Sequence, residues 1–192
     1  MKVLKFGGTS VGSVASIRQI QQIIARVSED CVVVVSALGG ITDQLLHAAQ
    51  LALQPDDAYM EVYQAIRQRH IEMVNSLIDN PTVRQMLCHD LETILDELRS
   101  ILFGVHLVKD LSAKSEAVIV SYGEQLSSRI VTAALPGAVR KDSLQFIRTD
   151  HKQGQVLLNT DVTEQLVRNT FNPLPHLSVC PGFISRDTQT EE

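Results

Sequence analysis

The chain has 192 residues, of which 44% are hydrophobic and 20% are charged, and its formal net charge is −5. This length and apolar content suit one globular domain with a buried core. Its basic residues are scattered and form no run interleaved with aromatic residues, which argues against a nucleic-acid partner and favours small metabolites.

The three cysteines, Cys31, Cys88 and Cys180, are far apart in the sequence and odd in number. This pattern argues against a disulfide framework and predicts a reducing, cytoplasmic location. Neither the cysteines nor the six histidines have the spacing of metal ligands, so we expect no metal site. No stretch approaches the ~20 apolar residues that span a bilayer, and the apolar start is too short for a signal peptide. We therefore expect a soluble, unprocessed chain that does not bind membranes.

The first forty residues predict a strand, a helix and a second strand. Residues 3–6 and 31–35 are short apolar runs that precede glycine pairs, and both predict buried strands. Between them, isoleucines recur at helical spacing, and Ser13 or Ser16 can cap this helix. A strand, helix, strand unit is typical of a parallel sheet.

The middle of the chain predicts three helices. Residues 41–53, 57–78 and 83–105 carry apolar side chains at helical spacing. Asn80 and Pro81 separate the last two, because asparagine caps helices and proline suits the first helical turn. We expect these two helices to form an antiparallel hairpin.

The last third of the chain predicts two more helices and short strands. Residues 116–135 predict a long helix that is interrupted at Gly123. Residues 161–171 predict a second helix, capped by Thr160 or Asp161. Short apolar segments predict strands at Val139, 146–147 and 177–180.

Together these elements predict an α/β fold. We expect a three-layer α/β/α domain with a mainly parallel sheet and a helical-hairpin insertion at about residues 56–107. No internal repeat or linker is apparent, so residues 1–192 are expected to form one unit.

The segment from Lys5 to Ser10 has residues that suit phosphate binding. Gly7 and Gly8 lack Cβ atoms, so the backbone there can approach a phosphate closely and present amide donors. The Lys5 ammonium can neutralise charge on a transferring phosphoryl group. Taken alone, two glycines after a strand are more typical of a tight turn. The dinucleotide fingerprint and the P-loop pattern are both absent.

Four segments, in this order, resemble the amino acid kinase family and, within it, the aspartokinases. They are Lys-Phe-Gly-Gly-Thr-Ser at 5–10, the second Gly-rich loop at 35–43, Gly-Glu-x-x-Ser at 123–127 and the Gly-Phe loop at 181–184. The resemblance implies an amino acid kinase-like fold. It also implies ATP-dependent phosphorylation of the β-carboxylate of L-aspartate to 4-phospho-L-aspartate, the first step toward lysine, threonine, methionine and isoleucine.

The resemblance also implies roles for single residues. Lys5 would be the catalytic cation, and the phosphate and ATP contacts would come from Lys5, Gly7, Gly8, Ser10 and Ser36. The substrate contacts would come from Thr42, Glu124, Gly182 and Phe183. Among these, Glu124 would receive the α-ammonium of L-aspartate through a charge-assisted hydrogen bond. Mg²⁺ would arrive with ATP, and no protein nucleophile is needed because the substrate carboxylate attacks.

Complete aspartokinases continue with a Leu-Gly-Arg-Gly-Gly-Ser-Asp segment, an ATP-binding half and regulatory domains, and these do not occur in residues 1–192. We therefore expect the segment alone to have little or no kinase activity, and the full-length protein to be a homo-oligomer. The long insertion resembles that of bifunctional aspartokinase/homoserine dehydrogenases.

Two alternatives stay open at this point. One is another amino acid kinase, acting on glutamate, acetylglutamate or a nucleoside monophosphate, although Phe6, Thr9, Ser10 and the insertion favour aspartokinase. The other is a noncatalytic regulatory module of the same fold. Taken singly, Glu124 is typical of a solvated helix residue, Ser36 of a turn, and Thr42 of a helix cap.

Overall fold

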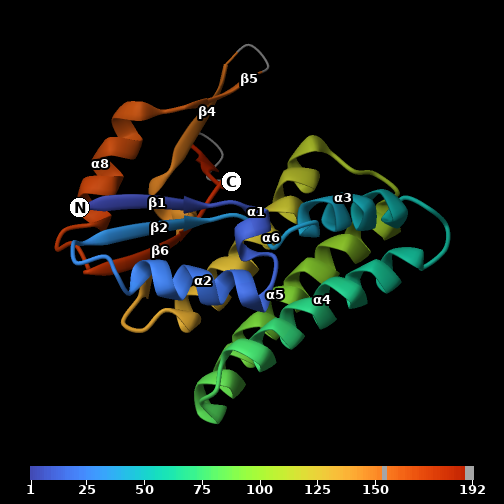
Figure 1. Ribbon diagram of the computed structural model, residues 1–192. Coiled ribbons are helices and arrows are strands. Elements are labelled where there is room, and N and C mark those ends of the chain that lie inside the picture. Colours follow the sequence, from blue (N-terminus) through green and yellow to red (C-terminus); the bar gives the residue numbers. More distant parts are fainter. Residues whose placement is uncertain (153–154, 189–192) are drawn as a thin grey trace.

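A parallel sheet forms the centre of the computed structural model, which describes residues 1–152 and 155–188 (Figure 1). Its four strands have the order β1-β2-β6-β3, and each neighbouring pair is parallel. The strands are β1 (Lys2–Phe6), β2 (Cys31–Val35), β6 (Leu177–Pro181) and β3 (Val139–Arg140). Phe6 is opposite Val35, and Val35 is opposite Pro181. The loops that follow β1, β2 and β6 therefore leave the sheet at the same edge.

Helices cover both faces of this sheet. On one face lie α2 (Val14–Ile24) and α6 (Ala113–Ala134), and on the other lie α7 (Ser143–Phe146) and α8 (Thr160–Thr170) (Figure 1). The predicted three-layer arrangement is confirmed. Alternate residues of β2 point to the two faces: Val33 and Val35 are fully buried, whereas Val32 and Val34 line a hollow of about 570 Å³ beside α7 and α8.

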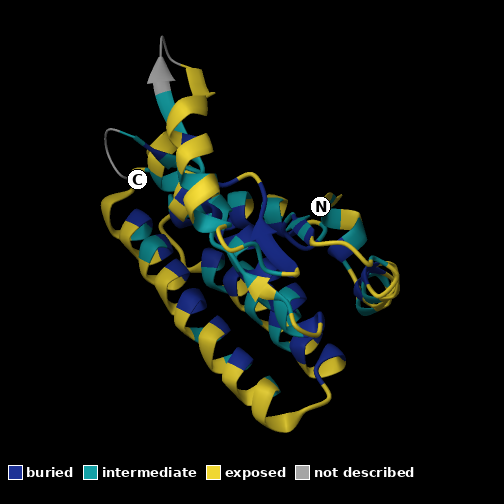
Figure 2. Ribbon diagram, turned by 90° about the vertical axis from the view of Figure 1, so that its left-hand side faces the viewer, coloured by how far each residue is buried: buried dark blue, intermediate teal, exposed yellow. Residues whose placement is uncertain are grey.

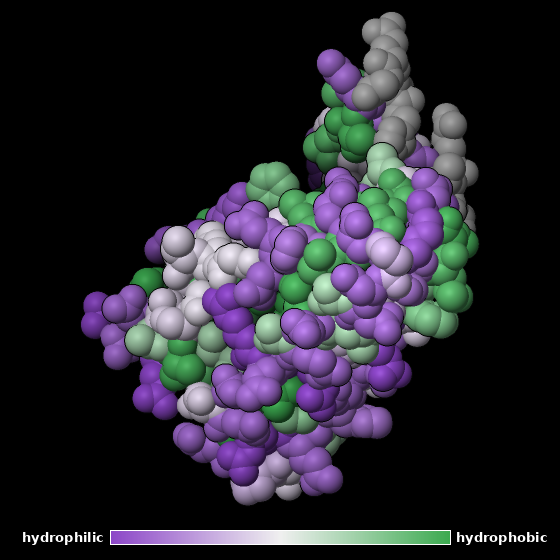
Figure 3. All heavy atoms as spheres, turned by 90° about the vertical axis from the view of Figure 1, so that its right-hand side faces the viewer, coloured by the Kyte–Doolittle hydropathy of each residue, from purple (hydrophilic) through white to green (hydrophobic). Residues whose placement is uncertain are grey.

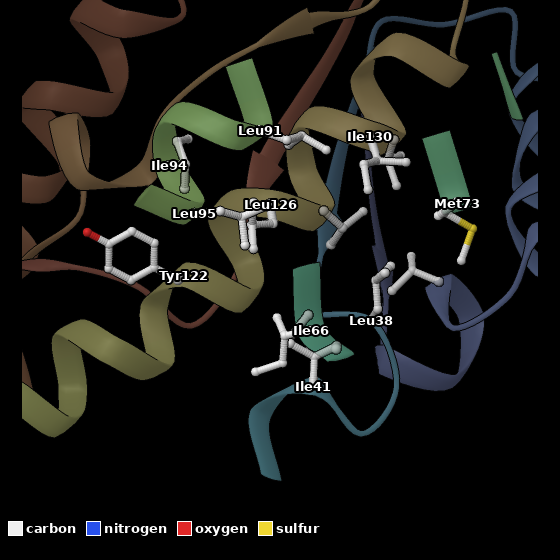
Figure 4. Packing of buried hydrophobic residues seen from close by; sticks show 14 of the residues in the cluster. Leu38, Ile41, Ile66, Met73, Leu91, Ile94, Leu95, Tyr122, Leu126 and Ile130 are labelled. Atoms are coloured by element: carbon white, nitrogen blue, oxygen red, sulfur yellow. The ribbon is translucent and has the colours of Figure 1, made fainter. Parts of the chain in front are cut away.

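A helical layer extends from the sheet edge and contains the insertion. Its helices are α3 (Ile41–Ala52), α4 (Ala58–Leu77) and α5 (Pro81–Val108). The expected hairpin of α4 and α5 is confirmed, and Asn80 caps α5 by accepting hydrogen bonds from the N–H groups of Thr82 and Val83. Figure 4 shows Leu38, Ile41 and Ile66 in the apolar cluster that joins this layer to the second loop.

A second, smaller sheet was not predicted. It contains β4 (Arg148–Lys152), β5 (Gln155–Leu158) and β7 (Arg186–Asp187), in the order β5-β4-β7. The pair β4 and β5 is antiparallel, whereas β4 and β7 are parallel. Three neighbouring apolar side chains of β5 are exposed, those of Val156, Leu157 and Leu158.

Three local predictions were wrong. The strand predicted at 146–147 is absent: Phe146 ends α7, because the Asp142 carboxylate accepts a hydrogen bond from the Leu144 N–H and starts a short helix there. The cap of α8 is Asn159, which accepts from the Val162 N–H, and not Thr160 or Asp161. Gly123 does not interrupt α6, which is continuous.

The predicted N-terminal cap of α2 is confirmed. Ser13, one of the two expected residues, caps α2 by accepting a hydrogen bond from the Ser16 N–H at 3.1 Å.

The central sheet and the inner faces of the helices are buried, whereas the outer face of α5 is exposed (Figure 2). Seen from the side of the helical layer, hydrophilic residues cover most of the lower part, and hydrophobic residues gather toward the upper right (Figure 3). No helix in the described ranges is long and apolar enough to cross a membrane.

Candidate functional site

The first glycine loop leaves β1 and turns directly into α1 (Gly8–Val11). The Gly7 carbonyl accepts hydrogen bonds from the N–H groups of Ser10 and Val11, at 2.9 and 3.2 Å. A Cβ on Gly7 would meet nothing within 4 Å, so open space lies beside this residue. A Cβ on Gly8 would lie 3.2 Å from the Ala37 carbonyl oxygen. Gly8 therefore allows the first loop to contact the second.

The second glycine loop occupies residues 36–40, between β2 and α3. It is tied to the first strand because the Ser36 N–H donates to the Phe6 carbonyl at 3.1 Å. A Cβ on Gly39 would lie 3.1 Å from the Gly8 carbonyl oxygen. Gly40 has φ +80°, a left-handed conformation that favours glycine. The two loops thus pack backbone against backbone at the carboxyl ends of β1 and β2.

Thr42 follows this loop in the first turn of α3 and is half-buried. The N-cap of α3 is Gly40. The alternative that Thr42 is a helix cap is therefore wrong, and Thr42 is the second residue of the helix that follows the second loop. Ser10 lines a separate hollow of about 230 Å³ together with Gln19 and Ile20 of α2.

Helix α6 packs closely against the second loop at its Gly-Glu-x-x-Ser motif. A Cβ on Gly123 would lie only 2.7 Å from the Ala37 Cβ. The next residue, Glu124, is 7% exposed, so the alternative of a solvated helix residue is wrong. Ser127 is fully buried, and its hydroxyl donates to the Ser36 carbonyl at 2.7 Å.

The environment of Glu124 is suited to a cationic ligand. Burial raises the pKa of its carboxyl group, and hydrogen bonds from the backbone N–H groups of Ala37 and of Glu124 itself offset part of this shift. A buried carboxylate is costly unless it is paired. An ammonium group bound there would stabilise the ionised form and bring the pKa back down.

The Gly-Phe loop after β6 completes the cluster. The Gly182 N–H donates to the Val35 carbonyl at 2.8 Å, and a Cβ on Gly182 would lie 3.2 Å from the same oxygen. Phe183 has φ +54° and is 88% exposed. Its ring centroid lies 4.5 Å from the Lys5 Nζ. Left-handed backbone conformations at residues other than glycine are concentrated at functional sites.

The structure thus brings most of the expected site residues together at the carboxyl ends of the parallel strands. Lys5, Gly8, Ser36 and Phe183 lie at the ends of neighbouring strands, and Glu124 reaches the second loop from α6. They supply a cation, glycine-rich backbone and a buried carboxylate. Within residues 1–152 and 155–188, no three His, Cys, Asp or Glu side chains could jointly hold a metal ion.

One contributor was missed by sequence reasoning. Ser127 belongs to the recognised motif, but its hydrogen bond to Ser36 was not anticipated. Its spacing of three residues from Glu124 was the available signal, because residues i and i+3 lie on the same side of a helix.

A model of the amino acid kinase family matches residues 1–191. This chain belongs to that family. Among known amino acid kinases, aspartokinase 1 (chloroplastic) of Arabidopsis thaliana is 34% identical over 201 residues, which is 98% of this chain and 34% of the relative. The bifunctional aspartokinase/homoserine dehydrogenase 2 (chloroplastic) of the same plant is 28% identical over 144 residues, 74% of this chain and 15% of the relative.

The fold of this amino acid kinase chain also matches solved structures. Aspartokinase III of E. coli in complex with aspartate and ADP superposes with a TM-score of 0.84 at 23% identity, over 98% of this chain and 42% of that one. The similarity confirms the amino acid kinase fold. The chain spans about a third of the length of the aspartokinase 1 relative.

Proposed function

We propose that this chain forms the part of an aspartate kinase that binds L-aspartate and the phosphates of ATP. The observation that carries the proposal is Glu124, a buried carboxylate that contacts the loop between β2 and α3. It lies on the same sheet edge as Lys5 and the paired glycines. The aspartokinase names of the relatives, and the aspartate and ADP bound to the E. coli structure, support this assignment.

Glu124 would select an amino acid as the substrate. Its carboxylate would accept hydrogen bonds from the α-ammonium of L-aspartate, an interaction that a dicarboxylate without an amino group cannot make. Glu124 is buried beside the second loop and follows Gly123, which packs against Ala37, so its backbone position would need little ordering when the substrate binds.

Lys5 and the glycine loops would stabilise phosphoryl transfer. An oxygen of the substrate β-carboxylate attacks the γ-phosphorus, and the bond from that phosphorus to the β,γ-bridging oxygen breaks, so the products are 4-phospho-L-aspartate and ADP. The Lys5 ammonium and the backbone amides near Gly7 and Gly8 would offset the negative charge on the transferring group. Mg²⁺ bound to ATP would supply further positive charge.

Turnover in the complete gene product tests this proposal. Acyl phosphate formed from L-aspartate, L-glutamate or N-acetylglutamate is trapped with hydroxylamine and measured. We expect product with L-aspartate only, and we expect Lys5→Met to lower kcat by about 100-fold or more. Lys2→Met is the matched control, because Lys2 lies on the same strand but pairs with Glu29 at its other end. Product from glutamate or acetylglutamate, or no effect of Lys5→Met, would contradict the proposal.

A further inference from the structure

Arg69 projects from α4 of the helical insertion to both glycine loops. Its Nη2 donates a hydrogen bond to the Gly12 carbonyl at 3.4 Å. Its Nη1 lies 3.9 Å from the position that a Cβ would take on Gly40. Gly12 is the C-cap of α1, and Gly40 is the N-cap of α3. A single guanidinium group therefore lies beside the end of the short helix that follows the first loop and beside the end of the second loop.

Gly12, whose carbonyl Arg69 contacts, packs against the backbone of both glycine loops. A Cβ on Gly12 would lie 3.0 Å from the Gly8 carbonyl oxygen and 3.5 Å from the Gly39 nitrogen. Gly8 and Gly39 are themselves in contact. Glycines have no side chains to interlock, so these loops meet only through backbone atoms, and a side chain that contacts both sides adds a further restraint. Because Gly12 packs so closely on Gly8, a displacement of the Gly12 backbone would also displace the Gly8 backbone.

Arg69 is used differently from the neighbouring arginine on the same helix. Arg67 forms an ion pair with Glu92 of α5 and so joins the two helices of the hairpin. Arg69 is half-buried and, among the described residues, contacts a backbone carbonyl and pairs with no carboxylate. A planar guanidinium has five donors in a fixed geometry, so it can hold two backbone segments at once.

We propose that Arg69 is a positioning residue that fixes the two glycine loops relative to each other for phosphate and substrate binding. This inference rests on the proposed function. The helical insertion then serves as a support for the site. Phosphoryl transfer depends on the placement of the reacting groups, and small misplacements lower its rate strongly.

Amide hydrogen exchange of the 192-residue chain tests the structural part without any assay of activity. In Arg69→Gln we expect the amides of residues 7–12 and 36–42 to exchange roughly fivefold to tenfold faster, as for the loss of one charged hydrogen bond. Arg18→Gln is the matched control. Arg18 Nη2 also donates to a backbone carbonyl at 3.4 Å, that of Ser76, but near the far end of α4. In this control the loops should exchange as in the wild type.

Kinetics of the complete gene product test the functional part. Arg69→Gln should lower kcat/KM about 10-fold to 100-fold, with a melting temperature close to that of Arg18→Gln. In Arg69→Ala, added guanidinium ion should restore part of the lost rate, which a purely structural defect would not allow. Should Arg69→Ala fail to fold, Arg69→Lys and Arg69→Gln carry the test, with Lys expected to retain more activity than Gln.

The two proposals fail in different ways. Unchanged loop exchange in every Arg69 variant overturns the role of Arg69, whatever the activity of the protein. Equal losses of kcat/KM in Arg69→Gln and Arg18→Gln also overturn it. A wild-type protein that does not phosphorylate L-aspartate instead contradicts the proposed function, while the exchange experiment still decides whether Arg69 fixes the loops.

Discussion

The Ser127 hydroxyl donates a hydrogen bond to the Ser36 carbonyl across 2.7 Å, and so fastens helix α6 to the loop that follows β2. Ser127 is fully buried. The hydrogen bond also orients the loop that contacts Glu124, because Ala37 is the next residue along the chain.

Ser127→Ala should lower the free energy of unfolding by about 1–3 kcal/mol, because it removes a hydrogen bond of a fully buried hydroxyl and leaves the half-buried Ser36 carbonyl without this partner. Urea denaturation measures this change. The control is Ser121→Ala, in which the lost hydrogen bonds are local to α6: the hydroxyl donates to the Val118 carbonyl and accepts from the Gln125 side chain. This control should change stability by less than about 0.5 kcal/mol. Equal effects of the two variants would show that the tie to the loop is unimportant.

Gly123→Ala should destabilise the chain although alanine favours helices. The new methyl group would lie 2.7 Å from the Ala37 Cβ, and overpacking of this kind costs about 1–3 kcal/mol. Gly104→Ala in α5 is the opposite case, since its Cβ would meet nothing within 4 Å. There we expect a gain of up to about 1 kcal/mol. A stabilised Gly123→Ala variant would contradict the close approach of α6 to the loop.

His70 should make stability depend on pH below neutrality. Burial lowers the pKa of its imidazole from 6.5 to about 4, and its Nδ1 lies 2.7 Å from the Ile66 carbonyl. Between pH 4 and 6.5 the unfolded chain binds a proton that the folded chain does not, so stability falls as pH falls through this range. The full effect is roughly 3 kcal/mol.

Urea denaturation from pH 4 to pH 7 measures this dependence. His70→Phe should remove most of the slope, whereas His47→Gln, on the exposed side of α3, should leave it unchanged. A wild-type curve that is flat between pH 4 and 6.5 would show that His70 is accessible to protons in the folded state.

Phe183→Leu should weaken ligand binding with little effect on stability. The ring is 88% exposed and lies over the Lys5 ammonium at 4.5 Å, and an exposed cation–π contact contributes about 0.5–1 kcal/mol. The variant removes the π face and retains an apolar side chain. Calorimetric titration with ATP and L-aspartate measures the loss. Wild-type affinity in the variant would show that the ring has no part in binding.

Strong periodicity made much of the fold predictable. The first strand, helix, strand unit and the hairpin of α4 and α5 are confirmed, because each has a long apolar stripe or run that only one element type can bury. The β4–β5 hairpin was missed since Arg148–Lys152 is polar and lacks an apolar run, and β4 also pairs with the distant strand β7. Apolar content alone also misplaced a strand at 146–147, where the Asp142 cap decides the structure.

The site was predictable as far as its motifs extend. Four ordered segments placed Lys5, Glu124 and Phe183 in one group, and the structure brings them to one sheet edge. Contacts between distant segments were not predictable, such as that of Arg69 with Gly12, 57 residues apart. The cytoplasmic location and the homo-oligomeric state stay predictions, as do the roles of the individual site residues.

Calorimetric titration of L-aspartate into the wild-type chain and into Glu124→Gln tests the central claim most directly. Glu116→Gln, in the first turn of the same helix, serves as the control. The account predicts that the wild type and Glu116→Gln bind L-aspartate, that succinate, which lacks the amino group, binds much more weakly, and that Glu124→Gln loses the preference for L-aspartate. Equal binding of L-aspartate by the wild type and Glu124→Gln would contradict it.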